Sequence, residues 1–452
     1  MELKCAAQGL TVRKVKRKEK MMKNKAKIRS GCVKVLIVMF LALSLSSYVS
    51  AEDIALTWED CAKEAKANNP ELKAATENLA QARYSKIVTS SSALPALSAS
   101  LNGSIRDFSS NSLSYGLSTG MNIYDGNKNL NSILQAEEQI KYAEVNYNSV
   151  SASIRAKLRT AFIGVLKSQQ YLDIAGDIAK RRKQSAEMVA LRYDSGREHK
   201  GSVLIARANL AQSENDVKAS ERNLEIAQRK LSSYLGRDNF TPVAVKGDFA
   251  LSFRENTKPD INKLAVNTPA VKSLQIKKKI AEYSFSYANG SYYPSLDLSA
   301  SYGGSLSENP ITGNLSVGLG LSYNIFDFGG RDAGVLKNKS ALLQAEADEK
   351  SGILTAVLTL ESFWAALQNA IDNVSVQKML LDANVERVKI SEAQYSDGII
   401  TFDSWTIIEY NLISLQKSYI TNEADALAAE NDWINAIGGI LDYNLKTNGG
   451  SK

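Results

Sequence analysis

The chain has 452 residues, of which 44% are hydrophobic and 23% are charged, and its formal net charge is +7. That charge is concentrated in residues 1–51, which hold 12 of the 55 Lys and Arg residues but only Glu2 and Glu19 among the acids. The other 401 residues carry 43 basic and 46 acidic groups, a net charge of about −3. Because no basic excess remains outside the leader, the composition excludes a nucleic-acid partner.

Residues 1–51 predict a signal peptide. Residues 35–45 are apolar, they follow a basic stretch, and the small-residue sequence Val49-Ser50-Ala51 after them suits cleavage by a signal peptidase. The stretch before the apolar run is longer than an ordinary signal needs. We therefore expect an exported protein whose true start is Met21 or Met22.

The rest of the chain lacks the residues that catalysis usually requires. Cys61 is the single cysteine after the leader, so no intrachain disulfide is expected, and His199 is the only histidine in the sequence. A metal cluster, a His-dependent triad and a Gly-rich phosphate loop are all missing from the sequence. We expect no enzymatic activity, no catalytic residue, no metal site and no cofactor.

The central feature of the sequence is an internal duplication. Residues 122–236 align with residues 324–438 at a constant shift of 202 positions, without a gap. The matches include Asn122-Ile123-Tyr124-Asp125 with Asn324-Ile325-Phe326-Asp327, Tyr193 with Tyr395, and Gly196 with Gly398. The repeat is longer than a solenoid period, so we interpret it as two copies of one structural half. The predicted divisions are a first repeat at 52–236, an inter-repeat segment at 237–259, a second repeat at 260–438 and a tail at 439–452.

The aligned blocks predict long helices. All seven prolines lie outside them, and they are rich in Ala, Leu, Glu, Lys and Gln. Proline costs a helix interior about 3 kcal/mol, so its absence favours unbroken helices. Apolar residues at spacings of three and four give each helix one packed face. The predicted helices span residues 57–90, 127–193, 202–235, 260–289, 331–395 and 404–437.

Two segments between helices change to a period of two and predict four β-strands. Each strand alternates apolar residues with small polar ones over about ten residues, the length that a tilted strand needs to cross a bilayer. The apolar positions run from Leu97 to Ile105, from Tyr115 to Ile123, from Leu296 to Tyr302 and from Leu315 to Ile325. Aromatic residues near the strand ends suit a membrane interface. A soluble sheet would show the same alternation in any one strand, but two matched hairpins in an exported chain favour the membrane.

Four strands cannot close a barrel in lipid, where every unpaired backbone group costs several kcal/mol. The chain must therefore share its strands with other copies. Two copies would give eight strands and a lumen filled by side chains, whereas three copies would give twelve strands and a water-filled lumen. The serine-rich and glycine-rich polar face favours three copies.

Over residues 54–440 the sequence resembles the TolC family of outer-membrane efflux channels. The resemblance rests on Asn69-Pro70-Glu71-Leu72, on Pro95 and Pro294 before the hairpins, on the Asn-Ile-aromatic-Asp sequence after each hairpin, and on the repeated Tyr-x-x-Gly. It implies an α+β membrane protein: a trimeric twelve-stranded barrel in the outer membrane, continuous with a long periplasmic helical barrel. The segment from Arg237 to Thr268, together with the C-terminal tail, would form a girdle around the middle.

The resemblance also implies that the two Tyr-x-x-Gly breaks form the periplasmic tip and its gate. The expected tip residues are Tyr193, Gly196, Glu198, His199, Lys200, Tyr395, Gly398 and Asp403. Three copies of Asp403 would form an acidic ring that attracts cations, although Asp at this position also suits a helix N-cap. Ser202 is expected to cap the helix after the first break. His199 could act as a pH sensor or contact a metal, or it could be an inert residue of a solvated turn.

We therefore expect a passive conduit that exports small molecules or proteins as part of a tripartite efflux or type I secretion system. Its expected partners are two further copies of the chain, a periplasmic adaptor, an inner-membrane pump and outer-membrane lipid. The sequence does not distinguish the cargo or whether the pump is driven by protons or by ATP. The alternative from another class is a soluble periplasmic coiled-coil scaffold or adaptor.

Overall fold

The computed structural model describes residues 55–106, 110–251, 257–306 and 312–442, all within one compact unit, Ala55–Lys452. The predicted signal peptide lies outside the described residues and stays a prediction. The first half holds α2 (Trp58–Asn68), α3 (Pro70–Ser91), β1 (Ala96–Arg106), β2 (Ser110–Tyr124), α4 (Lys128–Asp194) and α5 (Lys200–Leu235). The second half holds α6 (Ile261–Asn267), α7 (Pro269–Asn289), η1 (Gly290–Tyr292), β3 (Ser295–Ser305), β4 (Thr312–Ser322), α8 (Gly330–Ser396) and α9 (Phe402–Ala436).

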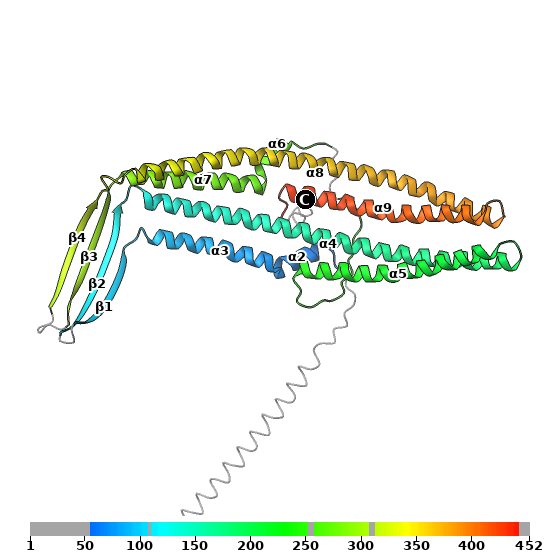
Figure 1. Ribbon diagram of the computed structural model, residues 1–452, viewed down its shortest axis with the longest axis horizontal. Coiled ribbons are helices and arrows are strands. Elements are labelled where there is room, and N and C mark those ends of the chain that lie inside the picture. The colour runs from blue at the N-terminus through cyan, green and yellow to red at the C-terminus, as the bar shows by residue number, and fades with distance from the viewer. Residues whose placement is uncertain (1–54, 107–109, 252–256, 307–311, 443–452) are drawn as a thin grey trace, which may run out of the picture. The chain divides into compact units, whose positions relative to one another are not determined.

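Apart from η1, the two halves have the same element order, as the duplication predicts (Figure 1). The long helices α4 and α8 each have 67 residues, which gives a length of about 100 Å at 1.5 Å per residue. The four predicted helices that contain no proline are confirmed to within two residues at each end. No proline lies within these helices, so none of their backbone hydrogen bonds is lost to proline.

The predicted helices at 57–90 and 260–289 are wrong as single elements, since each is broken near its first third. The break between α2 and α3 falls at Asn69, whose ψ of 124° is extended, and the break between α6 and α7 falls at Thr268, with ψ of 147°. In both cases a proline follows, which disfavours the helical conformation of the residue before it. Proline then suits the first position of the next helix, and the Asn69 and Thr268 side chains cap that helix.

The strands form one antiparallel sheet in the order β1-β2-β3-β4. The register places Leu117 opposite Tyr302 and Leu298 opposite Leu319 on one face, whereas Ser118 lies opposite Ser301 on the other. The pairing of β2 with β3 is irregular between Asn122 and Tyr124. The fourth strand ends at Ser322 rather than at the predicted Ile325.

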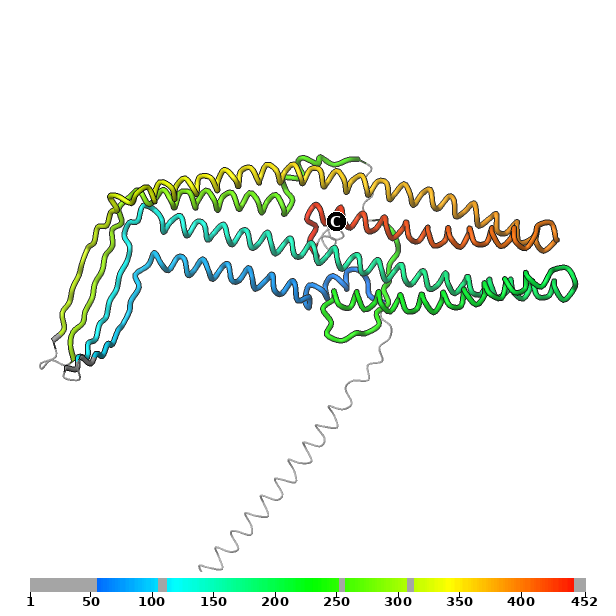
Figure 2. Tube along the Cα trace, viewed as in Figure 1, coloured from blue at the N-terminus to red at the C-terminus, as the bar shows by residue number. Residues whose placement is uncertain are grey.

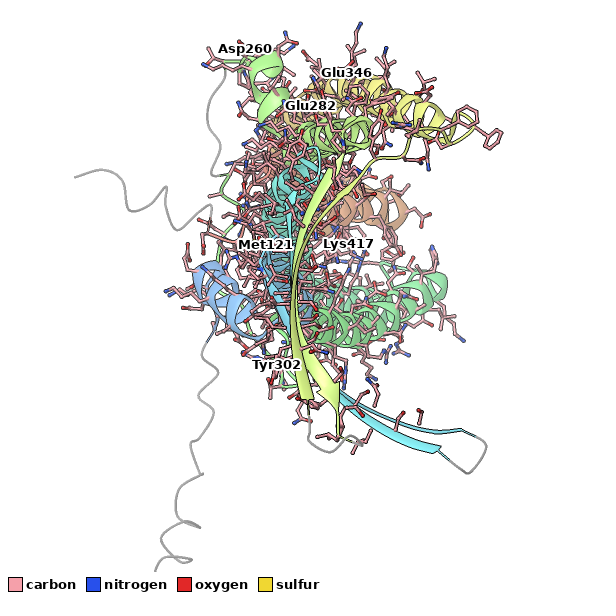
Figure 3. All side chains as sticks on the ribbon, turned by 90° about the vertical axis from the view of Figure 1, so that its left-hand side faces the viewer. Met121, Asp260, Glu282, Tyr302, Glu346 and Lys417 are labelled. Atoms are coloured by element: carbon pink, nitrogen blue, oxygen red, sulfur yellow. The ribbon has the colours of Figure 1, made fainter. Side chains whose placement is uncertain are left out.

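The apolar face of the sheet is uncovered within the chain. Figure 3 views the molecule from the strand end and labels Met121 of β2 and Tyr302 of β3. On β4, Leu315, Val317, Leu319 and Leu321 are between 65% and 72% exposed. In the described chain β1 and β4 each pair with one neighbour only, so both margins of the sheet are open. A monomer in water would leave this apolar face exposed and both sheet edges unpaired.

The helices continue the order of the strands. Beside the sheet α3 packs on α4, α4 on α7 and α7 on α8; toward the other end α5 packs on α4, α4 on α9 and α9 on α8. Throughout the described ranges, no helix sustains the apolar stretch that a membrane span requires.

Two equivalent apolar cores hold the middle of the helical layer. The first joins Trp58 of α2 to Phe162 of α4 and Leu231 of α5, and the second joins Trp364 of α8 to Trp433 of α9. The inter-repeat segment contributes Val243 and Val245 to the first core, and Leu441 after α9 joins it as well.

Gly236 provides a test of how the helix breaks are packed. It ends α5 with φ of +80°, and a Cβ atom added there would lie 2.7 Å from the carbonyl oxygen of Asn68. We expect Gly236→Ala to lower the free energy of unfolding by about 2 kcal/mol, because a left-handed non-glycine residue costs about 1–2 kcal/mol before the contact is counted. Chemical denaturation in detergent measures the change.

Gly176→Ala is the control, since this glycine lies inside α4 and a Cβ atom there has open space around it. Alanine should raise the stability by about 0.5–1 kcal/mol at that position. Equal effects of the two substitutions would contradict the packing described at Gly236.

Candidate functional site

The candidate site is the pair of turns at the end of the helices far from the sheet, where the trace reverses in both halves (Figure 2). Gly196 and Gly398 adopt φ of +75° and +78°. The next backbone N–H then donates to a carbonyl of the last helical turn: Arg197 to Arg192 and Ile399 to Gln394, both at 2.8 Å. This is the Schellman arrangement that glycine permits. It explains why a glycine stands at both breaks.

The caps of the following helices differ from both expectations. His199, not Ser202, caps α5, because its Nδ1 atom accepts a hydrogen bond from the Ser202 N–H at 3.3 Å. Ser202 instead donates its hydroxyl to Glu198 at 3.0 Å. Thr401, not Asp403, caps α9 by accepting from the Ser404 N–H, and Asp403 lies exposed in the first turn.

Tyr395 is the centre of the site and is 1% exposed. Its ring stacks on Trp405, with centroids 4.6 Å apart and planes 7° from parallel, and it contacts Phe402 at 6.1 Å. The guanidinium of Arg192 lies 4.8 Å from the ring centroid, a cation–π distance, and donates to the Ser396 carbonyl at 2.9 Å. These contacts join the end of α4 to the end of α8.

A second connection joins Tyr395 to the first turn. The Tyr395 hydroxyl donates to Glu198 at 2.9 Å, and the Glu198 side chain is 11% exposed. Burial works to raise the pKa of Glu198, but hydrogen bonds from the His199 N–H, Tyr395 and Ser202 outweigh it and lower the pKa. Burial and the bond to Glu198 raise the pKa of Tyr395 above its ordinary value. The pair is therefore an ionised acceptor with a neutral donor.

The structure brings together only some of the predicted tip residues. Tyr395, Glu198 and His199 share one network, whereas Tyr193 is 43% exposed and lies outside the Tyr395 cluster. Lys200 and Asp403 are exposed. The sequence analysis missed Arg192 and Trp405. Both lie within seven residues of a Tyr-x-x-Gly break, and this closeness was the signal that could have found them.

A buried ionic cluster lies further along the same helices. Arg182 of α4 donates to Glu409 of α9 at 2.8 Å, and both side chains are 7% exposed. Arg181 donates to the other carboxylate oxygen at 3.3 Å, and the Arg182 guanidinium lies 4.7 Å from the Tyr410 ring centroid. Burial raises the pKa of Glu409 in spite of the two arginines. Like the Tyr395 network, this cluster joins the first half to the second.

The described residues contain no group of three His, Cys, Asp or Glu side chains that could hold a metal ion. The contacts of His199 are with Ser202 and, at 3.9 Å, with Glu198. Its arrangement is therefore that of a helix cap.

The comparisons with known proteins agree with this geometry. The model of the outer membrane efflux protein family matches residues 61–237 and 261–439, which are the two halves. The chain belongs to the outer membrane efflux protein family. It is therefore an outer-membrane protein of a transport family rather than an enzyme.

Similar individual proteins are distant in sequence. Nodulation protein T of Rhizobium leguminosarum bv. trifolii is 22% identical over 306 residues, and the match spans 66% of this chain and 64% of that relative. The solved structure of CusC gives a TM-score of 0.77 at 18% identity, covering 87% of this chain and 96% of CusC. The MtrE outer membrane channel of Neisseria gonorrhoeae gives 0.76 at 17%, covering 85% and 90%. These two structures show that the fold is shared.

Glu409→Gln tests the buried ionic cluster. The substitution keeps the side-chain size but leaves the buried Arg182 without its anion, so we expect a loss of about 3 kcal/mol in the free energy of unfolding. Glu386→Gln is the control, because Glu386 pairs with Lys389 at an exposed site where both side chains are at least 66% exposed. An exposed pair contributes about 0–1 kcal/mol, and equal losses would contradict the assigned role of Glu409.

The Glu198 network predicts a pH dependence at the tip. Folding lowers the pKa of Glu198 from its ordinary 4.5. The stabilisation from this carboxylate is therefore fully present above pH 4.5 and is lost as the pH falls through the lowered pKa of the folded state. The melting temperature of the wild type should therefore exceed that of Glu198→Gln at pH 6, and the difference should shrink toward pH 3. Tyr395→Phe, which removes one donor, should reduce the difference. A constant difference over this range would contradict the network.

Proposed function

We propose that three copies of this chain form a passive channel across the outer membrane, extended by a helical tunnel through the periplasm. The observation that carries the proposal is the four-stranded sheet, with an exposed apolar face and two open margins. Lipid covers the apolar face, and the open margins of β1 and β4 pair between copies. Three copies give twelve strands and a lumen lined by the serine-rich face.

The helical layer supports the same assembly. Its two margins beside the sheet, α3 and α8, both carry apolar side chains that are 56–70% exposed in the single chain. These are Tyr84, Ile87 and Val88 on α3 and Leu336, Leu343, Leu354 and Leu358 on α8. In the proposed channel these two different margins meet head to tail, a contact that forms a ring when the rotation between copies closes. A soluble periplasmic scaffold would have no use for the apolar sheet face, so we favour the channel.

In this proposal the channel supplies no energy. An inner-membrane pump would drive transport, and a periplasmic adaptor would join the pump to the tip, where the Ile399 side chain is 70% exposed. The system would be a tripartite efflux or type I secretion assembly that carries small molecules or proteins. Opening requires the packed helices of the tip to move apart, a transition that partner contacts can favour.

Asp403 provides the test of the proposed channel. Three exposed copies at the tip would attract cations, so Asp403→Lys should reduce the cation preference of single channels in planar bilayers and Asp403→Asn should reduce it less. The reversal potential in a salt gradient measures the preference. Glu71→Lys, an equal charge change at an exposed residue near the middle of the helices, is the control. If the purified protein forms no conducting pore, the channel proposal is wrong. If the pore conducts but both Asp403 variants keep the wild-type cation preference, the acidic ring is wrong.

A further inference from the structure

A cavity of about 430 Å³ lies between α4, α5 and α9. Both α5 and α9 pack on α4, so α4 forms the floor of the cavity and the other two helices form its walls. Its volume is in the range of pockets that bind small molecules. Every wall comes from one chain, so the cavity does not depend on how copies assemble. The function proposed above leaves it unused.

The cavity exists because small side chains face it. They are Ser168 and Ala175 of α4 and Ser213, Ala219 and Ser220 of α5. The shift of 202 residues relates these positions, in the same order, to Ala370, Gln377, Leu415, Thr421 and Asn422. Four of the five residues are larger in the second half. The side chains that leave this space are therefore particular to the first half of the chain.

Two ammonium groups line the cavity. Lys167 belongs to α4, and Lys417, which Figure 3 labels, comes from α9. The Lys167 Nζ atom lies 5.7 Å from the centroid of the Tyr171 ring. This cation–π contact occupies none of the three N–H donors with a conventional acceptor, so the ammonium can still donate to an anion. The shift relates Lys167 and Lys417 to the uncharged Asn369 and Asn215.

One carboxylate offsets part of this positive charge. Asp216 of α5 lies 3.7 Å from the Lys417 Nζ atom, and both side chains are 42% exposed. Gln212 also donates to Asp216 at 2.8 Å. A charge-assisted hydrogen bond is about 2.7–2.9 Å long, so the contact of Lys417 with Asp216 is a loose one. The cavity therefore presents two cations against one anion.

An aromatic ring and apolar side chains complete the lining. The Tyr171 hydroxyl lies 2.6 Å from the Thr421 hydroxyl and 3.0 Å from the Lys417 carbonyl oxygen, which holds the ring where α4 meets α9. Ala175 and Ile178, both buried, continue the apolar surface along α4. Such a surface suits a flat apolar group. A ligand that matches the whole cavity has an apolar body and a negatively charged end.

We propose that this cavity binds a small amphipathic anion. Its carboxylate, sulfonate or phosphate lies between Lys167 and Lys417, and its aromatic or apolar body lies against Tyr171 and the small side chains. The same chemistry serves a solute inside the proposed tunnel and a solute in the surrounding periplasm.

The probe for this site is 4-benzoylbenzoate, an aromatic carboxylate that crosslinks under ultraviolet light, applied to the protein in lipid nanodiscs. Mass spectrometry should find the label on the stretches of α4, α5 and α9 that line the cavity. Lys167→Gln and Lys417→Gln should each weaken labelling about fivefold, the effect of losing one exposed charge pair, and Asp216→Asn should strengthen it. Lys389→Gln is the control, because it removes an exposed ammonium from α8 and should change nothing.

Two further measurements separate the charge from the shape of the cavity. The neutral analogue 4-(hydroxymethyl)benzophenone should label the same stretches more weakly than the carboxylate. Ser220→Leu, which fills the cavity without changing its charge, should abolish labelling, and the melting temperature of each variant verifies its fold. Equal labelling by the neutral analogue, label confined to other stretches, or lysine variants that label like the wild type would overturn the site.

Planar-bilayer recordings with the same probe distinguish the two sources of the ligand. If the ligand binds from the tunnel, the probe should reduce the wild-type current and Lys417→Gln should restore it. An unchanged current together with specific labelling assigns the ligand to the periplasm. The absence of any current would count against the proposed channel, and the labelling result would still decide the site.

Discussion

The structure depends on the requirement that no strand margin stays unpaired in lipid. The sheet is apolar on one face and polar on the other, and β1 and β4 each have one neighbour within the chain. A soluble protein would cover such a face with helices, but here the helices extend away from the strand ends (Figure 1). In the proposed channel the chain is one sector of a larger cylinder, and both its sheet and its helical layer end in faces that a neighbouring copy covers.

The duplication turns this sector into a pair of similar units that are not equivalent. Six equal repeats around an axis would make every junction alike. Here the contact between the two halves holds the buried Arg182–Glu409 pair and the Tyr395–Glu198 bond. The positions that the shift of 202 residues relates to these four carry, in the same order, Asn384, Arg207, Tyr193 and Ile400. The difference lies in a few side chains, because the backbone turns are closely similar, as Gly196 and Gly398 show.

The sequence predicted the features that depend on local pattern. The proline-free amphipathic blocks predicted α4 and α8, and the alternation of apolar and polar residues after Pro95 and Pro294 predicted the strands. The breaks at Asn69 and Thr268 were also local, and the following proline could have predicted both. The use of His199 as a cap was less accessible, because Ser202 has the stronger intrinsic preference for that position.

Long-range pairs were beyond prediction for a different reason. Arg182 and Glu409 are separated by 227 residues, and each charge alone resembles any other on a helical surface. Their burial becomes visible only once α4 is placed on α9. Tyr395 and Tyr193 show the same limit, since the shared Tyr-x-x-Gly pattern gives a ring that is 1% exposed at one turn and 43% exposed at the other.

The mass of the protein purified from the outer membrane in mild detergent tests the central claim most directly. Native mass spectrometry that resolves protein from bound detergent should show three chains, because twelve strands close the sheet and leave a water-filled lumen. A stable monomer in detergent that retains native secondary structure would contradict the account, since four strands with two open margins would then be sufficient.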